Sequence, residues 1–110
     1  MTRNLELRLK AERDIVVARQ WYDQERPSLG TEFLDEVFSA IRNVVSTPFQ
    51  YPLVYRETRR ALLRHFPFAI YFRTSVNTVV VVGVLHTHRN PRKWQIREPA
   101  QGYGAIPVAA

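Results

Sequence analysis

Four consecutive valines, residues 79–82, constrain the fold more than any other part of this sequence. β-branched side chains favour extended backbone, and successive residues of a strand point to opposite faces of its sheet. A strand that is apolar on both sides has to be covered on both faces, as a central strand is. This strand is predicted to span 78–86 and to follow a second one at 66–73. The loop 75–77 then makes a hairpin, with Asn77 in left-handed backbone.

Two segments with helical periodicity come before these strands. Apolar residues recur three and four positions apart over 10–25 and over 29–46, which predicts two helices. Ser28 is expected to cap the second helix through its hydroxyl oxygen, and the helix should end at Thr47-Pro48. The short connection makes the pair an antiparallel helical hairpin. Aromatic residues at helical spacing should pack in the core, namely Trp21, Tyr22, Phe33 and Phe38.

Two further strands complete the predicted fold. Residues 5–9 alternate apolar and polar, and strand character returns at 60–64 after an irregular segment, 49–56. The order βααβββ indicates an α+β fold, in which a mostly antiparallel sheet is packed on one face by the helical hairpin. A length of 110 residues is that of one domain, which we assign to 1–98. The remaining residues, 99–110, have no periodicity and are expected to form a flexible tail.

The chain contains no cysteine, which excludes a disulfide framework, a thiol nucleophile and a Cys-based zinc site. No apolar stretch approaches the ~20 residues of a membrane span, and the N-terminus lacks an apolar signal segment. We therefore expect a cytoplasmic protein that does not bind membranes. His65, His86 and His88 could form a zinc site, but Glu98 is the only acid near the last two. We expect neither a metal nor a cofactor.

Charge is segregated along the chain. Residues 56–97 hold nine basic residues against the single acid Glu57, a net of +8, whereas residues 1–55 hold seven basic and eight acidic residues. Clustered cations repel one another, so such a surface favours an acidic or polyanionic partner. Arginine outnumbers lysine by fourteen to two, and its planar fork pairs with carboxylates and phosphates. The candidate residues for binding a partner are Arg59, Arg60, Arg64, Arg73, His86, His88, Arg89 and Trp94.

Each of these residues also has a structural alternative. Any one of the arginines could belong to an ordinary solvated strand face. Trp94 could cover the edge of the sheet while Arg89 pairs with a helix carboxylate such as Asp14. Because residues 56–97 contain almost no acidic residues, a solvated strand face is a poor explanation for all the arginines together.

Residues of distinctive type recur along the chain in a fixed order: Ala11, Asp14-Ile15, Trp21-Tyr22, Leu29-Gly30, Phe33, Pro48, Tyr51-Pro52, Arg59-Arg60, Arg64, the segment from Phe66 to Arg73, Leu85-His86, Arg89, Pro91 and Trp94. In this order and spacing they resemble the RelE/ParE superfamily of bacterial toxins from type II toxin–antitoxin operons, in particular its ParE-like branch. The resemblance covers about residues 5–98. The resemblance implies a small toxin that is held inactive by an acidic antitoxin. The flexible C-terminal segment of the antitoxin wraps the toxin, and the complex contacts operator DNA only through the antitoxin.

The resemblance leaves two targets open. ParE-like members poison DNA gyrase, whereas RelE-like members cleave mRNA in the ribosomal A site without a metal. Such cleavage needs a base, an acid and a cation in one pocket. Residues of these types are present: His65, His86, His88, Tyr71, Arg64, Arg73 and Arg89. RelE-like nucleases usually carry an arginine where this chain has Phe68, and an apolar ring cannot stabilise a phosphorane.

The sequence therefore favours a toxin that inhibits growth by binding DNA gyrase, and no catalytic residue is assigned. The alternative is a ribosome-dependent mRNA endonuclease. A plain nucleic-acid-binding module is a third, weaker interpretation, because the chain shows no recognised aromatic stacking platform.

Overall fold

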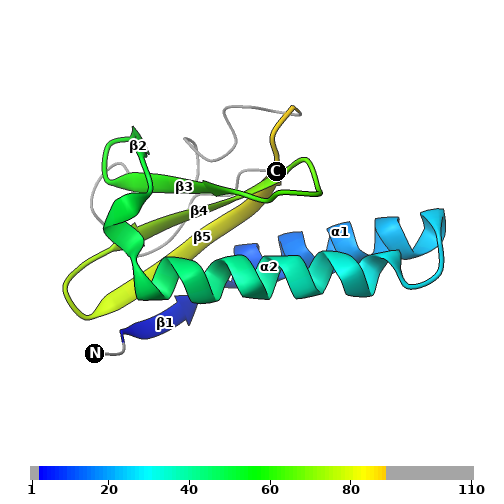
Figure 1. Ribbon diagram of the computed structural model, residues 1–110, viewed down its shortest axis with the longest axis horizontal. Helices are drawn as coiled ribbons and strands as arrows, with labels where there is room; N and C mark the ends of the chain where they lie inside the picture. The colour runs from blue at the N-terminus through cyan, green and yellow to red at the C-terminus, as the bar shows by residue number, and fades with distance from the viewer. Residues whose placement is uncertain (1–2, 89–110) are drawn as a thin grey trace.

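The computed structural model describes residues 3–88. The elements follow in the order β1 (Asn4–Leu7), α1 (Leu9–Glu25), α2 (Leu29–Ser46), a single 3-10 turn η1 (Pro48–Gln50), β2 (Leu53–Tyr55), β3 (Thr58–Leu62), β4 (Phe68–Thr74) and β5 (Thr78–His86) (Figure 1). Arg89, Trp94 and the predicted tail lie outside the described residues. None of the described helices is long and apolar enough to cross a membrane.

The strands form one five-stranded sheet in the order β1-β5-β4-β3-β2. The first strand runs parallel to β5, and every other neighbouring pair is antiparallel. The predicted α+β fold with a mostly antiparallel sheet is confirmed. The valine run lies in β5, between β1 and β4, which is the central position expected of it. Strand β2 falls in the segment predicted to be irregular, because three residues with a shifted register are too short to show a period.

The two helices form the predicted hairpin and cover one face of the sheet (Figure 1). Val79, Val81 and Val84 of β5 point to this helix side, where they join the main core. Val82 and Leu85 point to the other face and pack with Ala69 and Tyr71 of β4. The register shift opposite Tyr71 and Phe72 inserts one residue into β5. This bulge is why Val81 and Val84, three positions apart, both face the helices.

The aromatic residues of the helices divide between core and surface. Tyr22 and Phe33 are buried, with ring centroids 5.3 Å apart, as predicted. Trp21 and Phe38 are half-exposed, so their predicted place in the core is wrong. The prediction failed because each helix also carries an apolar residue outside the side that meets the sheet, and helical spacing alone does not say which side that is.

The connection between the helices is held by a carboxylate and not by the predicted serine cap. Ser28 adopts left-handed backbone, with φ of 75°, and its hydroxyl makes no capping hydrogen bond. Instead, Oδ1 of Asp23 on α1 accepts a hydrogen bond of 2.9 Å from the backbone N–H of Gly30. A Cβ atom at position 30 would lie 2.3 Å from that oxygen and 2.7 Å from the carbonyl oxygen of Arg19. The helices can approach this closely only because residue 30 is glycine.

A second backbone expectation is also wrong. Among the non-glycine residues of 3–88, positive φ occurs at Ser28 and Arg56, so Asn77 is not left-handed. The β4–β5 hairpin closes through the N–H of Ser75 and the carbonyl of Thr78. Arg56, in the turn between β2 and β3, has left-handed backbone instead. The sequence did not predict this turn.

Replacing Gly30 by alanine should destabilise the protein by about 1–3 kcal/mol, the usual cost of forcing an extra methyl group into filled space. At an exposed helical position the same change stabilises a protein by up to about 1 kcal/mol. The sign of the change in stability therefore shows whether the two helices approach closely at residue 30. Urea unfolding followed by circular dichroism measures the difference. Ser39→Ala, at an exposed position of α2, is the control. A Gly30→Ala variant that is more stable than the wild type would contradict the packing described here.

Candidate functional site

The register of β3 on β4 distributes the candidate arginines between the two faces of the sheet. Arg60 pairs with Tyr71, whereas Arg59 pairs with Phe72. Tyr71 belongs to the cluster turned away from the helices and Phe72 to the helix-side core. Arg73, next to Phe72 and opposite Val80, lies on the same side as Tyr71. We call the side that carries Arg60, Tyr71 and Arg73 the far face.

Tyr71 and Arg60 form a pair on the far face. The phenol of Tyr71 is buried, and burial raises its pKa, while a hydrogen bond from Arg60 and the charge of that guanidinium act in the opposite direction without cancelling the rise. The phenol is therefore protonated at neutral pH. It can donate a proton or a hydrogen bond, but it cannot serve as a base there.

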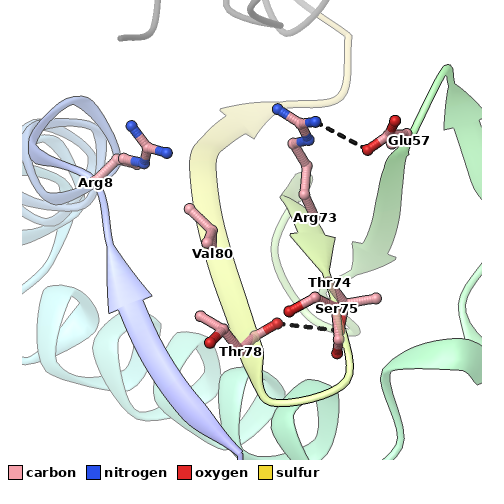
Figure 2. A pocket seen from close by; sticks show the side chains of 7 residues that line it. All are labelled: Arg8, Glu57, Arg73, Thr74, Ser75, Thr78 and Val80. Atoms are coloured by element: carbon pink, nitrogen blue, oxygen red, sulfur yellow. Dashed lines mark hydrogen bonds and ion pairs between the residues drawn. The ribbon is translucent and has the colours of Figure 1, made fainter. Parts of the chain in front are cut away.

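Arg73 lines a pocket where the far face reaches the β4–β5 hairpin. The lining residues are Arg8, Glu57, Arg73, Thr74, Ser75, Thr78 and Val80. Figure 2 shows the guanidinium groups of Arg8 and Arg73 on either side of β5, with Val80 between them. The hydroxyl groups and two guanidiniums suit a carboxylate or a phosphate group.

Both guanidiniums have carboxylate partners. Arg73 Nη2 donates to Glu57 Oε1 at 2.9 Å, and Arg8 Nε lies 3.2 Å from Glu6 Oε2. The Glu57 side chain is 80% exposed, in the β2–β3 turn. Ion pairs with such exposure contribute only about 0–1 kcal/mol. An incoming carboxylate can therefore replace Glu57 on Arg73 at little cost.

Arg59 acts on the helix side as a support for the segment after α2. Its Nη1 donates to the carbonyl oxygen of Tyr51 at 2.6 Å. Its guanidinium lies 5.2 Å from the ring centroid of Phe49, and Arg3 lies 5.8 Å from the same centroid. Arg3 also donates to the carbonyl of Val45 near the end of α2. The charge of Arg59 is therefore engaged in holding η1 and β2 against the helices.

Arg64 and His65 are tied to α2 through Glu36. Its Oε2 accepts hydrogen bonds from the backbone N–H groups of Arg64 and of His65, the latter at 2.8 Å, and its Oε1 lies 2.9 Å from His65 Nδ1. Burial would raise the pKa of Glu36, but these hydrogen bonds and the charge of His65 outweigh it and lower the pKa. Arg64 itself is exposed.

His86 and His88 lie away from the far-face pair. The ring of His86 stands edge-on to the ring of Phe68, at 5.3 Å between centroids, and Phe68 belongs to the helix-side core. The N–H of His88 donates to His86 Nδ1 at 3.0 Å. Within residues 3–88 there is no group of three His, Asp or Glu side chains that could hold a metal ion. The zinc alternative with His65 as third ligand is therefore not supported.

The sequence did not predict that Arg8 lines the pocket or that Asp14 binds the backbone of β5. Arg8 lies in the half of the chain with balanced charge, and only the pairing of β1 with β5 carries it to the pocket. Asp14, the alternative partner for Arg89, accepts a hydrogen bond of 3.1 Å from the backbone N–H of Val84. Hydrophobic periodicity contains no signal for either contact, because both join segments far apart in the sequence.

The fold is that of proteins from toxin–antitoxin complexes. A solved structure of the chromosomal ParDE TA system from P. aeruginosa matches with a TM-score of 0.69 at 16% identity, over 77% of this chain and 96% of that one. The toxin–antitoxin complex RelBE2 from Mycobacterium tuberculosis matches with a TM-score of 0.51 at 16% identity, over 78% and 99%. No protein-family model and no curated protein matches the sequence. The RelE/ParE-like fold expected from the resemblance is confirmed.

Changing Glu36 to glutamine should destabilise the protein at neutral pH by about 2 kcal/mol, because hydrogen bonds to a charged acceptor are lost or weakened. The folded-state pKa of Glu36 is lowered, so its contribution is present above the ordinary glutamate pKa and is lost as the pH falls through the folded value. The difference between wild type and Glu36→Gln should shrink on acidification. Unfolding curves at several pH values test this, with Asp35→Asn as control. A difference that does not change with pH would contradict the ionic hydrogen bonds.

Proposed function

We propose that this chain is the toxin of a type II toxin–antitoxin system and that it inhibits growth by binding DNA gyrase. The fold shared with ParDE and RelBE2 complexes supports the toxin class. The higher TM-score to the ParDE structure favours the ParE-like branch. We place the protein in the cytoplasm, which the absence of cysteine suits.

The acid–base groups of the far face are the reason for proposing a binding function and not RNA cleavage. Tyr71 is protonated and buried beside Arg60, while His65 is held by α2 and His86 stacks on the helix side. A protonated phenol cannot take the proton of a 2′-hydroxyl at neutral pH. Cations beside a protonated phenol are adequate for docking, whereas phosphodiester cleavage also needs a base.

The second candidate is a ribosome-dependent mRNA endonuclease, and one observation favours it. Arg60 could stabilise a phosphorane while the Tyr71 phenol protonates the leaving oxygen. The base would then have to be a group other than this phenol.

The replacement Tyr71→Phe separates these two functions, because it removes the phenolic proton and keeps the ring in the far-face cluster. Under the gyrase proposal, the inhibition of supercoiling by the purified protein should be unchanged. Under the nuclease alternative, cleavage of mRNA in a translating extract should fall by about 100-fold or more, the usual contribution of a general acid. Wild-type protein that cleaves transcripts and leaves supercoiling intact would overturn the gyrase proposal.

The partner in this proposal is an acidic antitoxin that contacts operator DNA on behalf of the complex. The antitoxin is expected to place a carboxylate on Arg73 in exchange for Glu57. Because it binds the folded toxin, it should raise the stability of the toxin by about 2.7 kcal/mol when present at 100 times its Kd.

Removing the guanidinium with Arg73→Ala should weaken antitoxin binding about tenfold or more, since a charge-assisted hydrogen bond is lost. Titration calorimetry with the purified product of the adjacent reading frame measures this. Arg42→Ala, at an exposed position of α2, is the matched control and should bind like the wild type. Equal weakening by both variants would mean that only the overall charge matters.

A further inference from the structure

A second cationic surface lies on the helix side of the sheet, around the turn η1. Figure 1 shows η1 joining the end of α2 to β2, at the end of the molecule away from the connection between the helices. Phe49 of η1 and Leu53 of β2 are 57% and 55% exposed, although both side chains are large and apolar. We call these two residues and the two arginines beside them, Arg3 and Arg59, the η1 patch.

Contacts printed across the η1 patch join its four residues into one surface. Leu53 of β2 is paired with Arg59 of β3, so the two side chains lie on the same side of the sheet. The guanidinium of Arg59 lies over the ring of Phe49, 5.2 Å from its centroid, and that of Arg3 lies 5.8 Å from the same centroid. Each arginine also donates to a backbone carbonyl, one at the end of α2 and the other directly after η1. The patch is therefore held in place before any partner binds.

The two arginines of the η1 patch have positive charge to offer a partner. Neither Arg3 nor Arg59 forms an ion pair with a carboxylate of residues 3–88. A guanidinium has five N–H donors, and the hydrogen bonds to backbone carbonyls leave most of them available. A purely apolar partner that covered Phe49 and Leu53 would bury these charges without compensation. The partner therefore has to bring anionic groups as well as apolar ones.

The composition of the η1 patch suits a protein better than a nucleic acid. Aromatic residues and arginine are enriched at the centres of protein interfaces, where a buried ring contributes most to affinity. A phosphate backbone offers no apolar surface to cover Leu53. The ring of Phe49, on which a base would have to stack, already has two guanidiniums over it.

A second copy of the chain is a poor occupant of the same surface. A two-fold contact would place the η1 patch against itself, so the arginines of one copy would approach those of the other. Each copy also carries a formal net charge of +6, which opposes self-association. A different protein, with acidic groups around an apolar depression, avoids both costs.

We propose that the η1 patch is the surface through which this toxin docks on DNA gyrase. Phe49 and Leu53 enter an apolar depression of gyrase, and carboxylates at its rim pair with Arg3 and Arg59. The inference rests on the proposed function and deepens it, because it places the target on the helix side of the sheet and leaves Arg73 on the far face to the antitoxin. Replacements in the patch should therefore separate gyrase inhibition from antitoxin binding.

Two replacements at one position test the apolar contact and the charge. Leu53→Asp and Leu53→Lys both remove the apolar side chain, but the first sets a carboxylate beside Arg59 and against the acidic groups of the partner. The readout is inhibition of supercoiling by the purified toxin with purified DNA gyrase. We expect the concentration for half inhibition to rise about tenfold or more for Leu53→Asp, and by a smaller factor for Leu53→Lys. Phe49→Ala should raise it as well.

The controls separate a lost contact from a lost fold. Val17→Asp introduces the same charge at an apolar residue of α1 that is 64% exposed, and it should inhibit like the wild type. Valine and aspartate have similar helix propensities, so α1 should stay folded. Leu53→Asp should bind the purified product of the adjacent reading frame with the wild-type Kd in titration calorimetry, which also shows that the variant is folded.

Other outcomes would overturn the inference. Equal inhibition by Leu53→Asp and the wild type would remove the η1 patch from the gyrase contact and leave the gyrase proposal intact. Leu53→Lys that is as weak as Leu53→Asp would mean that the partner is not acidic there. Wild-type binding to a DNA duplex without gyrase, weakened by Leu53→Asp, would make the occupant a nucleic acid, and a wild-type dimer in light scattering that Leu53→Asp dissociates would make it a second copy. A wild-type protein that leaves supercoiling intact would refute the proposed function itself.

Discussion

The parallel pairing of β1 with β5 is the interaction on which the rest of the structure depends. It brings the start of the chain beside the valine run, with Leu5 opposite Val79 and Leu7 opposite Val81. The N–H of Arg8 extends the pairing to the carbonyl of Val81, and α1 starts at the next residue. Further along β5, beyond the end of β1, the carboxylate of Asp14 on α1 accepts a hydrogen bond from the backbone N–H of Val84. The helical hairpin is positioned by these bonds.

Three carboxylates join elements of the structure through backbone hydrogen bonds. Asp23 links the two helices at Gly30, Asp14 links α1 to β5, and Glu36 links α2 to the turn after β3. Each accepts from backbone N–H groups that would otherwise lack a protein acceptor. Three of the eight acidic residues in the first half of the chain are thus engaged in internal contacts. Of the arginines in the second half, Arg64 is exposed, whereas Arg59 is engaged with Tyr51 and Phe49.

Much of the architecture could be predicted because it follows from local pattern. The two helices, the hairpin of β4 and β5, and the central place of the valine strand all come from periodicity and β-branching. Some failures were local, at the Ser28 cap and at Asn77, and others were contacts that depend on tertiary neighbours. The place of Trp21 on the surface and the pairing of the short strand β2 are of the second kind. The role of Asp23 at Gly30, seven residues away, depends on how closely the two helices approach.

The sequence by itself determined the layers of this protein and the sign of the charge on its second half, since apolar periodicity and formal charge are properties of the chain. Which arginines lie together was decided only by the tertiary structure. Side chains alternate along a strand, so a register that pairs Arg60 with Tyr71 sends Arg59 to the opposite face. The same pairing of strands carries Arg8, from the other end of the chain, to the pocket of Arg73.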